Sequence, residues 1–173
     1  MNKNNQIEIK DDYAILKIHS ETHGDFDILI DIDDVEEVSK HIWFINKFRG
    51  CGGYYKHYVI NNKHTLIHRL IMKPEKGLVV DHINGDGLDN RKENMRICTR
   101  AENRHNSGKY INNKSGHKGV FLYKYTKVPK WVAHIEVDKK RTHLGYFDDY
   151  EEACRARDEA ELEYYGEYAK LED

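Results

Sequence analysis

Apolar and polar residues alternate along the first part of the chain, a pattern typical of strands with one buried face. Within residues 6–32 the apolar positions recur at every second residue in separate runs, which predicts three short strands. Asp33 or Asp34 can then cap a short helix over residues 35 to about 41, because acidic residues also fill its first turn. We therefore expect a β-rich N-terminal part, which we bound at residues 1–60.

A second group of predicted strands follows this helix. The apolar run at 42–45 predicts a buried strand, and a glycine-rich turn follows at 50–53. Strands at 54–60 and 65–72 are expected to pair as a hairpin across the Asn61–Asn62 turn. Large aromatic side chains dominate small cores, so we expect core positions rather than base-stacking roles for three residues: Trp43, Phe44 and Tyr58.

The stretch at 79–106, VVDHINGDGLDNRKENMRICTRAENRHN, combines short apolar runs with polar loops. The apolar run at 78–80 predicts one strand, and the glycines at 85–87 predict a turn after it. Alternating faces at 95–98 predict a second strand, and a T-x-x-E capping box that begins at Thr99 predicts a helix. The expected order is strand, loop, strand and helix.

Three side chains of this stretch have the chemistry that phosphodiester hydrolysis requires. Asp81 offers an anionic oxygen and Asn103 an amide oxygen, the ligand types that suit Mg²⁺ or Mn²⁺. His82 titrates near neutral pH, so it can accept a proton from water. Asn103 falls in the first turns of the expected helix, where the helix dipole also favours a phosphate. A base beside a divalent ion predicts metal-assisted hydrolysis.

In order and spacing, these residues resemble an HNH homing endonuclease, which has the ββα-metal nuclease fold. His82 matches the first His of that family, the general base, and Asn94 matches the central Asn that braces the loop and orients that base. Asn103 stands at the position of the final His, which in a phage and intron subgroup is a metal-binding Asn paired with the Asp that Asp81 matches. The resemblance implies a nuclease core at residues 61–106 and products with 5′-phosphate and 3′-hydroxyl ends.

Further polar residues around this motif have less specific readings. Similar nucleases carry a His-Arg pair ahead of the Asp-His strand, so His68 can line the site, although a structural histidine is an equal alternative. We interpret Asp89–Asn90 as turn residues only. Arg96 also flanks the site. We predict DNA contacts for the remaining basic residues and one histidine, with pairing to acids as the alternative for the arginines: Arg69, Arg91, Arg100, Arg104, Lys109, Lys114, Lys118, Lys124, Arg141 and His143.

The C-terminal residues, 119–173, read as a second module after a basic linker at 107–118 that has few apolar anchors. Three strands are predicted, at 119–125, 131–137 and 141–147, and then a helix over 150–165. Small residues on one side of this helix can press closely onto the sheet: Ala153, Ala156 and Ala160.

The pieces GHKGVFLYK, KWVAHIEV, HLGYFDDYEEACRARDEA and YYGEYAKL resemble the plant ethylene-response-factor, or Apetala-two, DNA-binding domain. In that family the three-stranded sheet enters the major groove of DNA. Lys118 and Arg141 keep the expected basic character, and His143 replaces the tryptophan of the third strand. Other departures on the first two strands mean that the plant target sequence cannot be carried over: Phe121, Tyr123, Tyr125 and Glu136.

The net charge of −2 hides an uneven distribution. Residues 1–60 hold 7 Lys and Arg against 11 Asp and Glu, and residues 148–173 hold 3 against 11. Residues 61–147 hold 18 against 8, and Tyr and His are interleaved with these cations, which indicates nucleic-acid binding more than a solvated face. We expect the acidic C-terminal helix to face away from DNA.

Several classes are disfavoured by the sequence. The chain has no long apolar run and its N-terminus lacks the apolar core of a signal peptide. Cys51, Cys98 and Cys154 are scattered without a C-x-x-C pair, which argues against a zinc knuckle and a disulfide framework. A reducing cytosol, that of a bacterial host cell for a phage- or intron-encoded protein, is therefore the expected compartment.

Together these features predict an α+β protein that cuts DNA. We expect a homing-type, metal-dependent endonuclease, monomeric, with double-stranded DNA as its partner and no small-molecule substrate or membrane. Mg²⁺ is the expected cofactor, and Mn²⁺ should also support activity. The alternatives are a non-catalytic, sequence-specific DNA-binding regulator and a degenerate copy of the nuclease.

Overall fold

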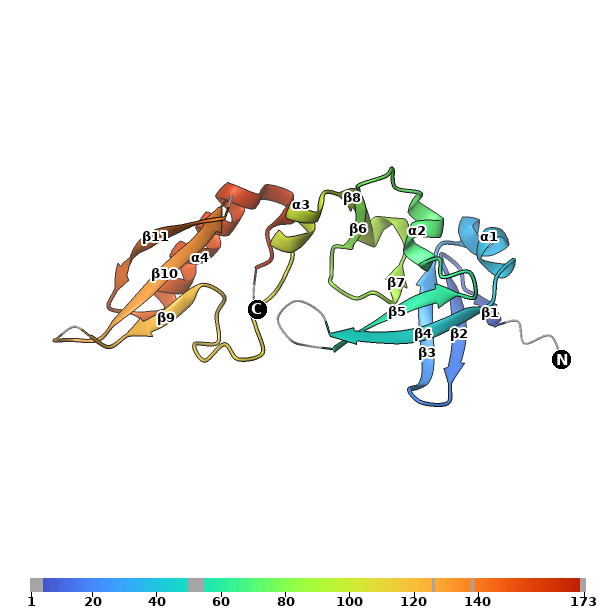
Figure 1. Cartoon of the computed structure of the whole chain (residues 1–173), viewed down its shortest axis with the longest axis horizontal. Coiled ribbons are helices and arrows are strands. Elements are labelled where there is room, and N and C mark those ends of the chain that lie inside the picture. The colour runs from blue at the N-terminus through green and yellow to red at the C-terminus, as the bar shows by residue number, and fades with distance from the viewer. Residues whose placement is uncertain (1–4, 50–54, 126, 138, 172–173) are drawn as a thin grey trace. The chain divides into compact units, whose positions relative to one another are not determined.

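The computed structural model (Figure 1) describes residues 5–49, 55–125, 127–137 and 139–171. Its residues divide into two compact units, and the boundary falls between Asn103 and Arg104. Unit 1 contains residues 5–49 and 55–103, so the predicted N-terminal part and most of the predicted nuclease core share one unit. Unit 2 contains residues from 104 onward. The glycine-rich turn predicted at 50–53 lies outside the described residues.

The main sheet of unit 1 has four strands in the order β1-β2-β3-β7. β1 (Gln6–Ile9), β2 (Ala14–Ser20) and β3 (Gly24–Ile30) are antiparallel, which confirms the three predicted strands. The fourth strand, β7 (Asp89–Asn90), joins β3 in parallel from a distant part of the chain. Alternate residues of β2 and β3 are buried and begin the core of the unit: Ala14, Leu16, Ile18, Ile28 and Ile30.

A helix and a hairpin close this core. η1 (Ile32–Asp34) leads into α1 (Val35–Ser39), as predicted, although no side chain caps either helix. β4 (Trp43–Arg49) pairs with β5 (Tyr55–Asn61) in an antiparallel ladder. Trp43 is buried, and its indole N–H donates to the carbonyl of Val38 at 2.8 Å. The expectation of a core position for Phe44 is wrong, because it lies on the opposite face of β4 and is 49% exposed; Tyr58 is half-buried.

The predicted strand at 65–72 is also wrong, because Ile67–Met72 forms the helix α2. Only Leu66 continues the ladder, as a single bridge to Ile60. Ile67 is buried, and Leu70 and Ile71 pack against the same core, which is the i, i+3, i+4 spacing of an apolar helix face. Tertiary burial of that face decides in favour of a helix over the extended form.

The elements predicted around the Asp-His pair are present. β6 (Val79–His82) pairs antiparallel with β8 (Met95–Cys98), and β7 and η3 (Lys92–Asn94) lie in the connection between them. α3 (Arg100–His105) follows β8. Its capping box is closed in both directions, because Thr99 N–H donates to Glu102 Oε2 at 2.7 Å and Glu102 N–H donates to Thr99 Oγ1 at 3.2 Å.

Unit 2 is a three-stranded antiparallel sheet covered on one face by a helix, as Figure 1 shows. β9 (Val120–Tyr123), β10 (Lys130–Val137) and β11 (Lys140–Phe147) confirm the predicted strands, in the order β11-β10-β9. α4 (Tyr150–Tyr165) has the predicted bounds and leads into η4 (Gly166–Tyr168). Of the three predicted small residues Ala153 and Ala160 are buried, and Ala156 is half-buried.

A buried ion network links α4 to the start of the sheet. Arg157 and Glu161 are nearly fully buried and form an ion pair one helical turn apart. Lys118 Nζ approaches Glu161 Oε1 at 3.0 Å and also donates to the carbonyl of His105 at 3.2 Å. Gly119 lies so close to Arg157 that an added Cβ would come within 2.5 Å of its Nε. The network therefore fixes the chain entering β9 against α4.

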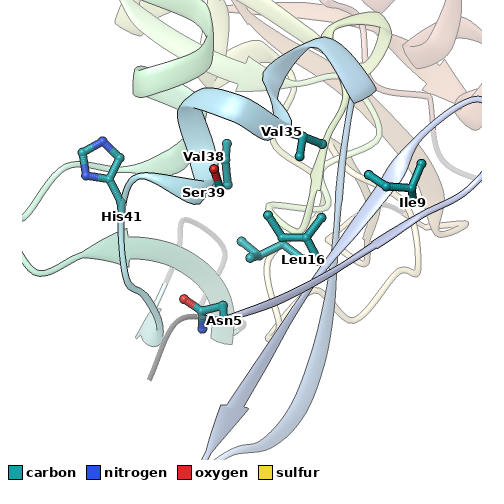
Figure 2. Close-up of a pocket in the computed structure, with 8 residues that line it drawn as sticks. Asn5, Ile9, Leu16, Val35, Val38, Ser39 and His41 are labelled. Carbon is teal, nitrogen blue, oxygen red and sulfur yellow. The ribbon is translucent and has the colours of Figure 1, made fainter. Parts of the chain in front are cut away.

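A pocket of about 340 Å³ lies in unit 1 between the first two strands and α1. Figure 2 shows Ile9 and Leu16 on the strand side and Val35 and Val38 on the helix side, so the lining is largely apolar. No residue of the Asp-His stretch lines it. Among the described residues, no helix has the length and apolar character needed to cross a membrane.

Candidate active site

The end of β6 delivers Asp81 and His82, and β8 faces it. Asp81 is buried, and in the ladder it lies opposite Arg96. The Arg96 guanidinium donates to Asp81 Oδ2 from Nε at 2.9 Å and from Nη2 at 2.8 Å. This pair satisfies part of a buried carboxylate that would otherwise be costly to desolvate. It also places a cation next to the predicted metal ligand; the sequence placed Arg96 beside the site but did not identify Asp81 as its partner.

His82 is oriented by a residue that the sequence reading missed. Its Nε2 lies 3.2 Å from Oδ1 of Asn90, a fully buried residue of β7. Because an amide oxygen only accepts, Nε2 carries the proton in the neutral ring and the lone pair is on Nδ1. The interpretation of Asn90 as a turn residue alone is therefore wrong. Asn90 therefore orients the His82 ring and favours the tautomer with the proton on Nε2.

A second histidine contacts His82. The ring of His68, in α2, meets the ring of His82 edge to face, with centroids 5.3 Å apart. Burial, followed by the charges of His82 and Arg69, lowers the pKa of His68 to about 4. Burial also lowers the pKa of His82, although the Asn90 hydrogen bond and nearby carboxylates oppose that shift. Burial therefore disfavours the charged form of both rings, and the neutral form is the one in which a histidine accepts a proton.

Asn94 braces the loop that follows His82. Its side-chain Oδ1 accepts from the backbone N–H of Asn84 at 3.0 Å, and its Nδ2 donates to Asn84 Oδ1 at 3.0 Å. The same Nδ2 donates to the carbonyl of Asp89 at 2.9 Å, and the Asn94 carbonyl accepts from Ile83 N–H at 2.8 Å. Asn94 is buried, so each of these bonds replaces water that cannot reach the group.

The N-terminal sheet also holds this loop. Leu29 N–H donates to the carbonyl of Leu88 at 2.9 Å, and Leu29 and Ile30 pair with Asp89 and Asn90 through the β3–β7 ladder. The His57 carbonyl is so close to Gly87 that an added Cβ would lie 2.8 Å from it. The β-rich N-terminal residues therefore support β7, the strand that contains Asn90.

An ion pair also holds the β7 segment in place. Asp89 is buried, and its two carboxylate oxygens accept from Arg91 Nε and Nη2, both at 2.8 Å. The Arg91 guanidinium holds the pKa of Asp89 below its ordinary value. Glu93 also pairs with Arg91 at 2.7 Å. The predicted DNA contact of Arg91 stays a prediction, and its partners in this structure are these acids.

Asn103 lies half-buried in the first turn of α3, where the sequence predicted it. The buried Cys98 thiol interacts electrostatically with Asp81 and with the backbone of Asn103. Burial and then the charge of Asp81 raise the pKa of Cys98, while a hydrogen bond from the Asn103 backbone N–H opposes the shift. Cys98 is the last residue of β8, and α3 begins two residues later. Across the described ranges, no group of three or more His, Cys, Asp or Glu side chains is placed to hold a metal ion.

The other predicted DNA-binding residues differ in their surroundings. Arg69 donates from Nη1 to the carbonyl of Leu78 at 3.2 Å, and Lys109 donates to the carbonyl of Gly116 at 2.8 Å. Lys118 is committed to the buried Glu161, so its structural role is clear while its DNA contact is untested. The remaining predicted contacts are exposed: Arg100, Arg104, Lys114, Lys124, Arg141 and His143.

Comparison with known proteins agrees with the position of this site. Residues 66–105 match the family described as HNH endonuclease. That match spans α2, β6, the loop held by Asn94, β8 and α3. It includes the residues placed around His82 but not the N-terminal strands that support β7. It shows that this part of the chain is similar to HNH endonucleases.

One curated relative is an uncharacterized HNH endonuclease of Acanthamoeba polyphaga mimivirus. It is 43% identical over 63 residues, which cover 30% of this chain and 16% of that protein. The chain therefore spans only a small part of the length of this relative. No solved structure matches the chain significantly.

Proposed function

We propose that this chain is a metal-dependent, homing-type DNA endonuclease in which His82 is the general base. The observation that carries the proposal is the His82 ring held by the buried Asn90 within the stretch that matches HNH endonucleases. A base with its lone pair fixed on Nδ1 can take a proton from water as the water attacks a phosphodiester. A DNA-binding fold alone would need no such arrangement.

The residues around the base have separate parts in this proposal. Asn90 accepts the hydrogen bond from Nε2–H of His82 and fixes the orientation of that ring. Asn94 holds the loop that contains Asn90 closed. His68 covers His82 and adds to the burial that disfavours the charged form of both rings. The groups are preorganised before substrate arrives, and such preorganisation is where much of the rate enhancement of enzymes originates.

The donor set fits a hard cation. Asp81 and Asn103 would hold Mg²⁺, or Mn²⁺, through oxygen atoms, with water and a DNA phosphate oxygen as further ligands, because Mg²⁺ usually keeps several waters. When bound, the ion would stabilise charge on the phosphate and on the leaving 3′ oxygen. Arg96 orients the Asp81 carboxylate through Oδ2 and reduces its charge. Affinity for the ion in the absence of DNA should therefore be weak.

The C-terminal unit would choose the cutting site. Its sheet has one face against α4 and one face without a helix, and exposed cations, among them Lys124 and Arg141, lie on its strands and turns. Phosphate contacts by such side chains position a protein on duplex DNA. The proposed substrate is double-stranded DNA, bound by a monomer.

The proposal is tested by incubating the full chain with supercoiled plasmid and Mg²⁺ or Mn²⁺, and resolving the products on a gel. We expect nicked or linear DNA with 5′-phosphate and 3′-hydroxyl ends, and none in excess chelator. Calorimetry should show little heat of Mg²⁺ binding without DNA and a larger one with an uncleavable DNA analogue. Cleavage that persists in chelator contradicts the metal-dependent mechanism.

The Asp81–Arg96 pair favours one rival, a non-catalytic DNA-binding regulator. A carboxylate held by two guanidinium hydrogen bonds is a weaker ligand than a carboxylate exposed to water. The same gel decides between the two, because a regulator binds the plasmid and leaves it supercoiled with either ion.

A further inference from the structure

The face of the unit 2 sheet opposite α4 carries exposed aromatic rings. Trp131, Ala133 and Ile135 of β10 pack toward α4, so the alternating residue Val132 faces the other side. In the ladders, Val132 lies opposite Phe121 on one neighbour and Tyr146 on the other. Val132 is only 4% exposed beneath these rings, whereas Phe121 is 42% and Tyr146 is 59% exposed.

The rings form a connected surface across the sheet. The Tyr123 ring lies 6.1 Å from Tyr146 on the far strand and 5.6 Å from Tyr125, which is 89% exposed. His143 lies 4.7 Å from Tyr146. The interplanar angles of these pairs are 64°, 61° and 48°, so the rings meet edge-on or tilted and do not stack on one another. No pair among them therefore covers its rings face to face. We call Phe121, Tyr123, Tyr125, His143 and Tyr146 the aromatic face.

The charge around the aromatic face matches an anionic polymer. Residues 105–147 contain nine Lys and Arg and two Asp and Glu. Lys124 lies between Tyr123 and Tyr125, and Arg141 is exposed on β11. An array of aromatic rings within a cationic surface is the combination that holds a nucleic-acid backbone while its bases stack on the rings. An apolar protein partner would not require the excess of cations.

We infer that the aromatic face binds unpaired DNA bases by stacking, at locally opened or single-stranded sites. The inference rests on the proposed function in taking DNA as the partner. Bases inside a duplex are already stacked and present only their edges, which are read by hydrogen-bonding side chains such as Arg, Asn and Gln. This face offers flat rings in their place, and Arg141 lies opposite Glu136 in the ladder. DNA whose strands are locally separated is therefore the form that the aromatic face binds best.

The test measures binding of the full chain, in chelator, to three fluorescent DNAs of one sequence. These are a paired duplex, the duplex with a short central bubble, and the single strand. We expect the bubble and the single strand to bind at least about tenfold more tightly than the duplex. Tyr146→Ala should lower affinity for the bubble by roughly 5- to 100-fold, the range for loss of one stacked base. Tyr146→Phe keeps the ring and should bind like the wild type.

A matched control is Tyr164→Ala, which removes an exposed tyrosine from α4 and should leave all three affinities unchanged. The inference is overturned by equal binding to paired and opened DNA, or by a loss as large for Tyr146→Phe or Tyr164→Ala as for Tyr146→Ala. Cleavage of plasmid with Mg²⁺ separates this result from the proposed function. A chain that cuts but shows no preference for opened DNA contradicts the inference alone, and one that prefers opened DNA but never cuts contradicts only the nuclease.

Discussion

Side chains are buried and hydrogen-bonded around His82 but exposed on the aromatic face. Around His82, Asn90 and Asn94 are buried and hydrogen-bonded, and the His82 ring is covered by His68. On the aromatic face, Tyr125 and Tyr146 project from the sheet with most of their surface exposed. The first arrangement fixes a proton acceptor before substrate arrives, and the second leaves ring area open for a partner. In the proposed account, burial and order therefore distinguish the region that would perform chemistry from the one that would recognise DNA.

The largest expected effect on stability concerns His68 and pH. Its pKa is about 4 in the folded protein, against an ordinary value of about 6.5 in the unfolded chain, so the unfolded chain takes up the proton first as the pH falls. The stabilising contribution of the neutral ring is complete above pH 6.5 and is lost between about pH 6.5 and 4. That loss amounts to about 3 kcal/mol.

Urea unfolding at pH 7 and pH 4 measures this effect. His68→Phe and His68→Gln have no group to protonate, so their unfolding free energies should fall by about 3 kcal/mol less than that of the wild type over this range. Both variants are needed because one preserves ring shape and the other polarity. A pH dependence equal to that of the wild type in both variants would show that His68 is not held neutral by the fold.

The next effect concerns Asn90, which acts on His82 and is a positioning residue. Asn90→Ala removes the acceptor for Nε2–H, so the ring can adopt the wrong tautomer. By analogy with partners that orient metal-bound histidines, we expect the cleavage rate at saturating protein to fall by about 10- to 100-fold while DNA affinity is kept. Asn112→Ala, at an exposed position of unit 2, is the control. An unchanged rate in a folded Asn90→Ala protein would remove Asn90 from the account.

The smallest effect concerns the cations of unit 2. Arg141→Ala should weaken DNA binding by a few-fold and lower the slope of log affinity against log salt by about one, the result expected for one lost phosphate contact. Arg155→Ala removes an exposed arginine from α4 and should leave the slope unchanged. Equal slopes for Arg141→Ala and the wild type would mean that β11 does not contact the DNA backbone.

The sequence predicted the elements whose pattern is local. Alternation at Ala14, Leu16 and Ile18, and the capping box at Thr99 and Glu102, depend on neighbours a few residues away. It failed at α2, because a short apolar run is compatible with either a strand or a helix until its burial is known. It placed His82 and Asn94 in the loop and strands where they lie.

Two of the missed features depend on contacts between distant parts of the chain. Asn90 became visible only when β7 paired with β3, a contact between residues 60 positions apart. Lys118 looked like a DNA ligand because Glu161, its buried partner, lies 43 residues further on. No local spacing predicts such pairs. The β3–β7 pairing beside the site and the ion pair of Lys118 could therefore be identified only from the tertiary structure.

The central claim is that the His82 region performs the chemistry and the aromatic face performs the recognition. The most direct test is single-turnover cleavage by wild type, His82→Ala and Tyr146→Ala, on opened DNA, with protein raised until binding saturates. We predict that His82→Ala stays about 10²- to 10⁴-fold slower at saturation, as for loss of a general base, and that Tyr146→Ala recovers the wild-type rate. Cleavage by His82→Ala at the wild-type rate would contradict the account.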